Sequence, residues 1–586
     1  MFYDFTVKIP VVPGRIILKK NGDATYVLYE ISRTYNPEKR YNVPRRVVIG
    51  KVAASDTALM HPNEKFNGYF PKTALPEERP EAYRSCCLRI GTYIVIRKVM
   101  QELKLIPIIG KRMGKDSGLF MDLMAYLIVD ECNAGQYYPD FAFCHPLFSE
   151  GMRIHSDWKV SKFLHSLTKE QIIGFLDDWN DLKDHKQRVY VYYDSTNRNC
   201  QAGDMDIVEF GKAKEDRGLP VFNSSIVFDK TNRTPLFYEE YPGSINDVSQ
   251  FPYMVQKTMS YGYKHVGFIL DRGYFSKENI DYMDGNNYHF IIMVKGCKKL
   301  VSALVMSRLH TFETDRSCAI RPYNVYGTTC NGRLYANDTK DRCFHIYFNS
   351  ARMAAERSQL EARIDRLKDC LKKCEGQKVA FTSTYSNYFT LNYNGDGVFL
   401  FAEERQDTIQ NELDLCGYFC IITTERMTAE QALILYKGRD VSEKLFCSEK
   451  TFIGSTSMRV QSGESLSAKV FLEFVTLIVR NRIYNCLKET MIRIERKRNY
   501  LTVPAAVKEL EKIEMVRRNN EFYRLDHAVT NTQKVILSSF GLSAENVIGQ
   551  ATEIGNLLRS GSSIKDAKEE TEEGGNNGTF EDDCIC

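Results

Sequence analysis

The sequence predicts an α/β protein with a mixed β-sheet, because two apolar, β-branched runs each end at an aspartate followed by turn-forming residues. The run "RVYVYYDSTN" leads to Asp194, and "HVGFILDRGY" leads to Asp271. Short runs of this kind are typical of buried strands. Side chains at the ends of neighbouring strands converge in an α/β sheet, so we expect the two aspartates to lie together. Such a pair requires a metal ion or a basic partner, because an unpaired buried carboxylate is costly.

The elements between and after the aspartates indicate a particular order. Two strand-like runs, "NSSIVFD" and "PLFYEEY", follow Asp194 and are joined by the turn "KTNRT". A turn and helix come next, then the strand that leads to Asp271, the short helix "SKENIDYMD" and the strand "YHFIIMVKG". Three meandering strands followed by helix, strand, helix and strand, with acids on the first and fourth strands, predict an RNase H-like core.

A later stretch, "LYKGRDVSEKLFCSEK", carries a carboxylate, two cations and a phenol at helical spacing. If it is helical, Tyr436, Arg439, Glu443 and Lys450 fall on roughly a 60° stripe. A carboxylate there can hold a divalent metal while the cations hold phosphates, as phosphodiester chemistry requires. The alternative is a solvated helix face with chance charges, which the two upstream acids make less favourable.

The start of this helix is marked by Thr428 and Gln431, which have the spacing of a capping box. Gly438 interrupts the helical pattern and costs about 1 kcal/mol relative to alanine. It is either a point of close approach or a tolerated flaw.

Together these residues resemble the DDE-type insertion-sequence transposases of the bacterial group with the Y-R-E-K signature. The resemblance is carried by "YYDSTN" around Asp194, "YPGSINDV" at 241–248, "FILDRGYFSKENI" around Asp271, and the spacing Y-x2-R-x3-E-x6-K from Tyr436 to Lys450. It extends over residues 25–545 or so, because "YEISRTYNPEKRYNVPRRVVIGK" also resembles the opening of these proteins.

The resemblance implies a metal triad of Asp194, Asp271 and Glu443 that binds two Mg²⁺ ions, with Mn²⁺ able to replace them. Water would free the 3′ end of the element at this site, and the new 3′-hydroxyl would then attack target DNA. Positions that contact DNA near the cleavage site correspond to Tyr436, Arg439 and Lys450.

The expected partners are double-stranded DNA, as terminal inverted repeats and as target, and a second copy of the chain in a synaptic homodimer. No nucleotide cofactor and no membrane are expected, and the expected location is the bacterial cytoplasm, at the nucleoid. Two alternatives stay open: an RNase H-like endonuclease or integrase relative that moves no element, and a DNA-binding derivative without catalysis. Inverted repeats beside the gene would separate a transposase from the endonuclease, and the presence of all three acids argues against the inactive derivative.

Composition is that of an ordinary globular protein, with 43% hydrophobic and 26% charged residues. We expect no export signal and no membrane span, and the 17 cysteines, an odd number, are expected to be reduced thiols. Charge is uneven: residues 1–120 hold 21 Lys+Arg and 11 Asp+Glu, a net of +10. A basic opening segment indicates nucleic-acid binding, although a solvated basic face would look alike.

An inserted subdomain is predicted because Glu443 follows Asp271 by 443 − 271 = 172 residues, more than the core requires. Within it Leu360, Ile364, Leu367 and Leu371 form a short apolar seam. Docking of this helix on its own domain is favoured over a coiled coil between two copies.

The predicted divisions combine an α+β N-terminal region, a core in two parts and a helical C-terminal region. They are 1–187 for recognition of DNA ends, 188–300 and 411–500 for the core, 301–410 for the insertion, 501–565 for the helical region, and 566–586 for an acidic, disordered tail.

Overall fold

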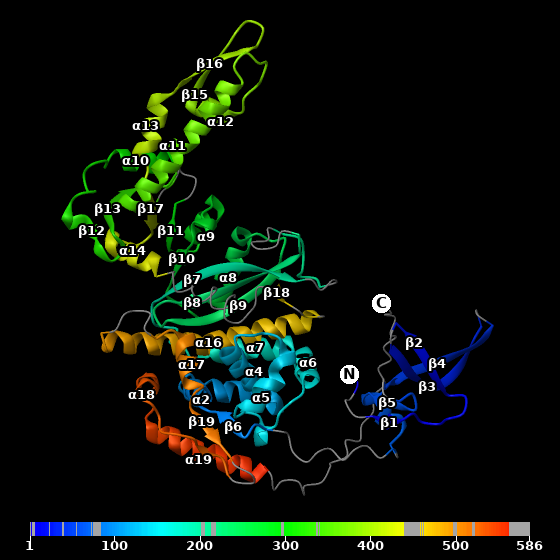
Figure 1. Ribbon diagram of the computed structural model, residues 1–586. Coiled ribbons are helices and arrows are strands. Elements are labelled where there is room, and N and C mark those ends of the chain that lie inside the picture. The colour runs from blue at the N-terminus through cyan, green and yellow to red at the C-terminus, as the bar shows by residue number, and fades with distance from the viewer. Residues whose placement is uncertain are drawn as a thin grey trace. The chain divides into compact units, whose positions relative to one another are not determined.

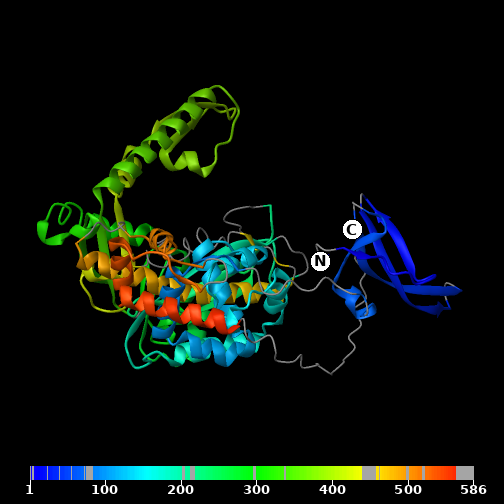
Figure 2. The same cartoon turned by 60° about the horizontal axis from the view of Figure 1, so that its bottom comes forward.

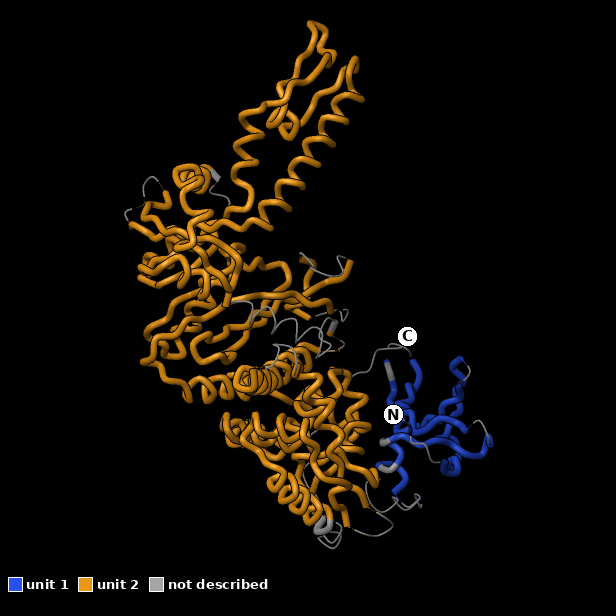
Figure 3. Tube along the Cα trace, turned by 60° about the vertical axis from the view of Figure 1, so that its left-hand side comes forward, with its two compact units in different colours: residues 1–83 blue, residues 84–586 orange. Residues whose placement is uncertain are grey.

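The computed structural model places the chain in two compact units, residues 1–83 and 84–586, each described here by itself (Figure 3). The division at residue 83 falls inside the region 1–187 that the sequence analysis treats as one. The structure describes residues 2, 6–22, 24–37, 40–53, 56–71, 73, 84–200, 205–211, 218–294, 298–335, 338, 340–438, 457–458, 460, 462–495, 501–517 and 522–561.

The first unit is an antiparallel sheet of five strands in the order β1-β5-β4-β3-β2, with one short helix. Val27, Ile49, Met60 and Phe66 form its small core. The elements are β1 (Val7–Lys8), β2 (Ile16–Asn21), β3 (Ala24–Asn36), β4 (Tyr41–Val52), β5 (Leu59–Pro62) and α1 (Glu64–Tyr69).

The second unit is built on a mixed sheet whose central part has the predicted order (Figure 1). β7 (Val189–Cys200), β8 (Val221–Asp229) and β9 (Thr234–Pro242) form the antiparallel meander. After α8 (Asp247–Ser260), β10 (Val266–Leu270) pairs parallel to β7. After α9 (Lys277–Gly285), β11 (His289–Met293) pairs parallel to β10. The spatial order β9-β8-β7-β10-β11 is that of an RNase H-like fold, so the predicted fold class is confirmed.

The sheet continues beyond β11 through one strand in the predicted second part of the core, and then through three strands inside the predicted insertion 301–410. β17 (Tyr418–Thr423), β14 (Arg342–Phe348), β13 (Val325–Gly332) and β12 (Ala319–Ile320) follow in that order, each antiparallel to the last. Nearly all of β14 is buried, and it pairs with β13 on one edge and with β17 on the other. The structure therefore places residues 319–348 in the core sheet, and the part of the insertion with its own core is 350–414.

This subdomain, seen as a yellow-green body in Figures 1 and 2, folds around the predicted seam. Ile364 and Leu371 are buried, and Leu360 and Leu367 pack at the border of the same cluster. Their partners are residues of the same subdomain, so docking within the chain is confirmed over an exposed dimer seam. The elements are α11 (Ser350–Lys373), α12 (Ser383–Tyr388), β15 (Phe389–Tyr393), β16 (Phe399–Glu404) and α13 (Gln406–Asp414).

The two ends of the subdomain meet at the sheet. β14 and β17 are neighbours, with Phe348 opposite Tyr418, and the amide of Asn349 donates to the carbonyl of Gly417 at 3.0 Å. The subdomain thus fills the loop of a β-hairpin.

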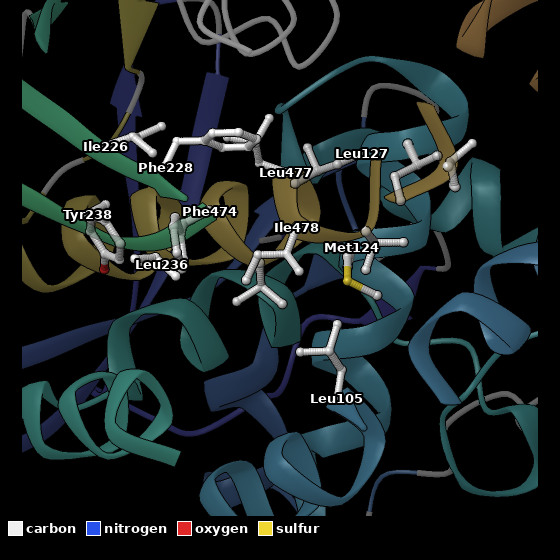
Figure 4. Packing of buried hydrophobic residues seen from close by; sticks show 14 of the residues in the cluster. Leu105, Met124, Leu127, Ile226, Phe228, Leu236, Tyr238, Phe474, Leu477 and Ile478 are labelled. Carbon is white, nitrogen blue, oxygen red and sulfur yellow. The ribbon is translucent and has the colours of Figure 1, made fainter. Parts of the chain in front are cut away.

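The long helix α16 (Gly463–Arg493) lies between the sheet and the helices that precede β7. Figure 4 shows Phe474, Leu477 and Ile478 of α16 between the β8–β9 side chains, such as Phe228 and Leu236, and Met124 and Leu127 of α4. The expected packing of this apolar helix under the sheet is confirmed. Its companions are α2 (Gly91–Glu102), α3 (Leu105–Met113), α4 (Ser117–Asp130), α5 (Tyr138–Cys144), α6 (Asp157–Ser166) and α7 (Lys169–Asp181).

The C-terminal region is helical, as predicted, but it also shares a small sheet with the start of the second unit. The strand β19 (Glu514–Val516) pairs with both β20 (Arg524–Leu525) and β6 (Cys87–Arg89). Further helices of the described residues are α10 (Lys298–Met306), α17 (Val503–Leu510), α18 (Asn531–Ser538) and α19 (Ala544–Gly561). Among the described residues, no helix is both long enough and apolar enough to span a bilayer.

We expect Leu371→Ala to destabilise the inserted subdomain by about 2–5 kcal/mol, because the leucine is 2% exposed in a small core. Hydrogen exchange of peptides from 350–414 measures this change. Glu361→Ala, on the exposed face of the same helix, is the control and should change the opening free energy by less than ~0.5 kcal/mol. Equal effects of both changes would mean that the seam does not form the core.

Candidate active site

The parallel pairing of β7 with β10 brings Asp194 and Asp271 side by side. The register places Ile269 beside Tyr192 and Leu270 beside Tyr193, so the next residues along the two strands are Asp271 and Asp194. Because side chains alternate between the faces of a sheet, both acids lie on the face of Tyr192. Each is partly exposed to solvent. The expected convergence of the two aspartates is confirmed, while their role as metal ligands stays a prediction.

Two carboxylates at neighbouring positions suit a divalent cation. Adjacent strands lie about 4.8 Å apart, where like charges repel and a bound cation relieves the repulsion. Hard cations such as Mg²⁺ prefer carboxylate oxygens. Within the described residues, no group of three or more His, Cys, Asp and Glu side chains is gathered for a metal. The predicted third ligand, Glu443, lies outside those residues.

A hydrogen bond on the opposite face of the sheet ties the two acidic positions together. The hydroxyls of Ser195, next to Asp194, and of Tyr274, three residues after Asp271, lie 2.8 Å apart. The ring of Tyr274 is buried against Tyr193, and burial raises its pKa well above the usual value. The phenol therefore stays protonated and available for this bond. The amide of Tyr274 also donates to the carbonyl of Asp271 at 3.0 Å, which fixes the turn after β10.

The motif "YPGSINDV" forms the turn between β9 and α8. The phenol of Tyr241 donates to Asp247 at 2.7 Å, and the Asn246 side chain accepts from the amide of Ser249 at the start of the helix. The side-chain amide of Asn223 donates to the carbonyls of Pro242 and Ile245. These bonds fix the start of α8. Phe251 of α8 packs against Tyr193 and Tyr274, on the face of the sheet opposite the two aspartates, so the motif supports the strands that carry them.

The helix α14 (Ala429–Lys437) carries the start of the predicted stripe. Its capping box is confirmed, since Thr428 and Gln431 exchange both side-chain-to-amide bonds. Tyr436 is only 4% exposed and belongs to the main core. Ala432, Leu433 and Tyr436 of this helix are all buried. The Tyr436 side chain, which the sequence analysis expects to face DNA, is therefore part of the core. Its predicted contact with DNA stays a prediction.

Arg439, Glu443 and Lys450 fall in residues 439–456, which the structure does not describe. Both neighbours of this segment are attached to β7. Before it, the phenol of Tyr192 donates to the carbonyl of Leu435 at 2.9 Å. After it, β18 (Ser457–Met458) pairs with Asn199 and Cys200. Asp194 lies between these two attachment points along the strand.

Sequence reasoning missed a buried ion pair at the far end of β7. The Arg198 guanidinium donates to Glu473 of α16 at 2.5 Å, and both side chains are 1% exposed. Removing either partner of such a pair leaves an uncompensated buried charge and costs about 3–5 kcal/mol. The signal was a single glutamate within the apolar run "VFLEFVTLIV", because a carboxylate in a buried helix requires a cation.

The second unit thus combines an RNase H-like sheet with two carboxylates, Asp194 and Asp271, at the ends of adjacent parallel strands. Residues 191–479 match the family model described as "Transposase DDE domain". The match identifies residues 191–479 as a DDE-type transposase domain. Membership of the Y-R-E-K group stays a prediction.

Other comparisons add little to this assignment. The solved structure described as "Cryo-EM structure of piggyBac transposase synaptic complex with hairpin DNA" is 7% identical, with 75% of this chain and 69% of that chain covered. Its TM-score of 0.31 is too low to support a conclusion. No curated protein sequence matches the chain.

We expect Tyr274→Phe to destabilise the second unit by about 1–3 kcal/mol, because it leaves the buried Ser195 hydroxyl without this partner. Denaturant unfolding measures the loss. Tyr253→Phe is the matched control on α8, where the ring is 66% exposed, and should leave stability unchanged. A neutral Tyr274→Phe would show that the bond does not hold the two strand ends.

Proposed function

We propose that this transposase cleaves DNA at the ends of an insertion element and joins the freed 3′-hydroxyl ends to target DNA by two-metal phosphoryl transfer. The observation that carries the proposal is the position of Asp194. It lies beside Asp271 and between the two points where the segment containing Glu443 attaches to β7.

Asp194, Asp271 and Glu443 are proposed to hold the metal ions. When bound, two Mg²⁺ or Mn²⁺ ions would activate the attacking oxygen and stabilise the leaving 3′-oxygen. The chain's own part is to hold three carboxylates in fixed positions and to keep the scissile phosphate in line with the attacking hydroxyl. Strand cleavage and strand joining are both displacements at phosphorus, so one site serves both, and the exchange of phosphodiester bonds needs no ATP.

Contacts with DNA are proposed for the Y-R-E-K positions and for the basic N-terminal region. Arg439 suits a bidentate phosphate contact, Lys450 a point-charge contact, and Tyr436 completes the set. Residues 1–187 are assigned to recognition of the terminal repeats. Two copies of the chain would bring two element ends together, in the bacterial cytoplasm at the nucleoid.

We expect Glu443→Gln to reduce Mg²⁺-dependent cleavage by at least ~100-fold, because losing one carboxylate ligand removes several kcal/mol of transition-state stabilisation. The substrate is a plasmid carrying the gene's own flanking ends, and the measurement is cutting at the element boundary. Asp194→Asn and Asp271→Asn should have the same effect. Glu430→Gln, an exposed acid in the first turn of α14, is the matched control and should retain activity.

Each other outcome contradicts part of the proposal. Boundary cutting without joining to target DNA would indicate an endonuclease that moves no element. Boundary binding without cutting in any variant, with Mg²⁺ or Mn²⁺, would indicate an inactive DNA-binding derivative. Cutting that survives Glu443→Gln would mean that the triad is wrong.

A further inference from the structure

The sheet of the first unit, blue in Figure 3, is covered by a helix on one face. Phe66 of α1 joins Val27 in the small core on that face. Side chains alternate between the two faces along a strand, so Tyr26, Leu28 and Glu30 of β3 lie on the other one, which we call the outer face. Within the described residues of this unit, α1 is the one helix, so the outer face has no helix over it.

Two lysines lie in one row across the outer face. Lys19 of β2 and Lys51 of β4 both pair with Tyr26 of β3, one from each side. Paired residues of neighbouring strands share a face, so both lysines belong to the outer face. Both are exposed.

Two arginines lie on the same face and are oriented by Glu30. Arg46 pairs with Glu30, and Arg33 lies on the same side because its partner, Pro44, is two residues from Arg46 along β4. Both arginines donate their Nε–H to the Glu30 carboxylate, which leaves the terminal Nη groups for another acceptor. The side chain of Glu30 is 5% exposed, whereas those of Arg33 and Arg46 are 60% and 39% exposed. The acid is thus hidden while the guanidinium groups are presented.

The charge and shape of the outer face fit duplex DNA. Four exposed cations share this face with a single buried carboxylate, and DNA carries a negative charge every ~1.7 Å along its axis. β3 and β4 also continue past the end of β2 as a two-stranded ribbon, since β2 pairs with Ala24–Tyr29 while β3 stays paired with β4 beyond Glu30. The major groove admits a two-stranded β-ribbon.

The helices of residues 84–187 are less suited to this task. Most residues of α2 and α4 are buried in the main core. A recognition helix needs a face that can enter a groove. Of the region 1–187 that is assigned to the terminal repeats, the first unit therefore offers the better surface.

We propose that the outer face of β2, β3 and β4 reads the terminal repeats, with the β3–β4 ribbon in the major groove. Arg33 and Arg46 contact base edges, because a guanidinium fork matches the acceptors of guanine. Lys19 and Lys51 contact phosphates as point charges and set the position of the unit on the duplex. This role rests on the proposed function, which supplies the element ends as the DNA.

The phosphate contacts are tested with neighbouring lysines on opposite faces of β2. Binding of the full chain to a labelled duplex of the element end is measured by fluorescence anisotropy at several salt concentrations, without divalent metal. Lys19→Gln should weaken binding about 5-fold at ~0.15 M salt and reduce the slope of log K against log salt by ~0.9, as expected for one lost phosphate contact. Lys20→Gln, the next residue and exposed on the opposite face, is the control and should change neither quantity.

The base contacts are tested with neighbouring arginines on opposite faces of β4. Arg46→Lys keeps a positive charge beside Glu30 but loses the planar fork. It should reduce the preference for the element end over an unrelated duplex by at least ~5-fold, with little change in the salt slope. Arg45→Lys, exposed on the opposite face, should keep the preference. If Arg46→Lys lowers the unfolding temperature, the outcome for the two lysine variants decides.

Two results would overturn the outer face as the reading surface. Equal losses in both members of each pair would mean that the unit attracts DNA through its overall charge alone. Unchanged binding in Lys19→Gln and Arg46→Lys would leave the face to solvent or to an acidic protein. Either result leaves the proposed function intact if the unchanged protein cuts at the element boundary. Failure of the unchanged protein to bind or cut its element ends, with Mg²⁺ or Mn²⁺, would instead overturn the proposed function.

Discussion

The parallel pairing of β7 with β10 is the constraint on which the rest of the structure depends. It fixes Asp194 next to Asp271, an arrangement that two negative charges would not adopt unaided. The surrounding elements oppose this repulsion from both faces. Tyr274 and Phe251 pack behind the two strands, while α14 and α16 cover the face that carries the acids.

Much of this arrangement could be predicted because its signals are local. An apolar run that ends at an acid and a turn marks Asp194 and Asp271 without knowledge of the fold. The order of strands and helices then predicts which ends meet. The capping box at Thr428 and Gln431 likewise depends on residues only three apart.

The parts that could not be predicted depend on contacts between distant residues. Residues 319–348 join the sheet because β14 pairs with β17, some seventy residues away along the chain, and no local pattern records that partner. Tyr436 is expected from the sequence to face DNA, and only the packing of α14 against the sheet shows that its side chain is buried. Lys230 resembles any lysine in a turn until the last turn of α14 is placed against it.

The buried pair of Arg198 and Glu473 adds little net stability to the fold. Its Coulombic attraction is largely offset by the loss of hydration, so the net gain is small. A shift of α16 along the sheet would, however, separate the charges inside the core. The pair therefore joins α16 to β7, the strand that bears Asp194, inside the core.

The closure of the β14–β17 hairpin around the inserted subdomain has a consequence for how such proteins can diverge. The free-energy cost of closing a loop rises by only ~0.6 kcal/mol for each doubling of its length. The stability of the sheet therefore depends little on the length of the segment that the hairpin encloses. Because Phe348 and Tyr418 face each other across the junction, residues 350–416 can be lengthened, shortened or exchanged as a cassette. The acids on β7 and β10 would keep their geometry throughout, which separates the evolution of this appendage from that of the catalytic sheet.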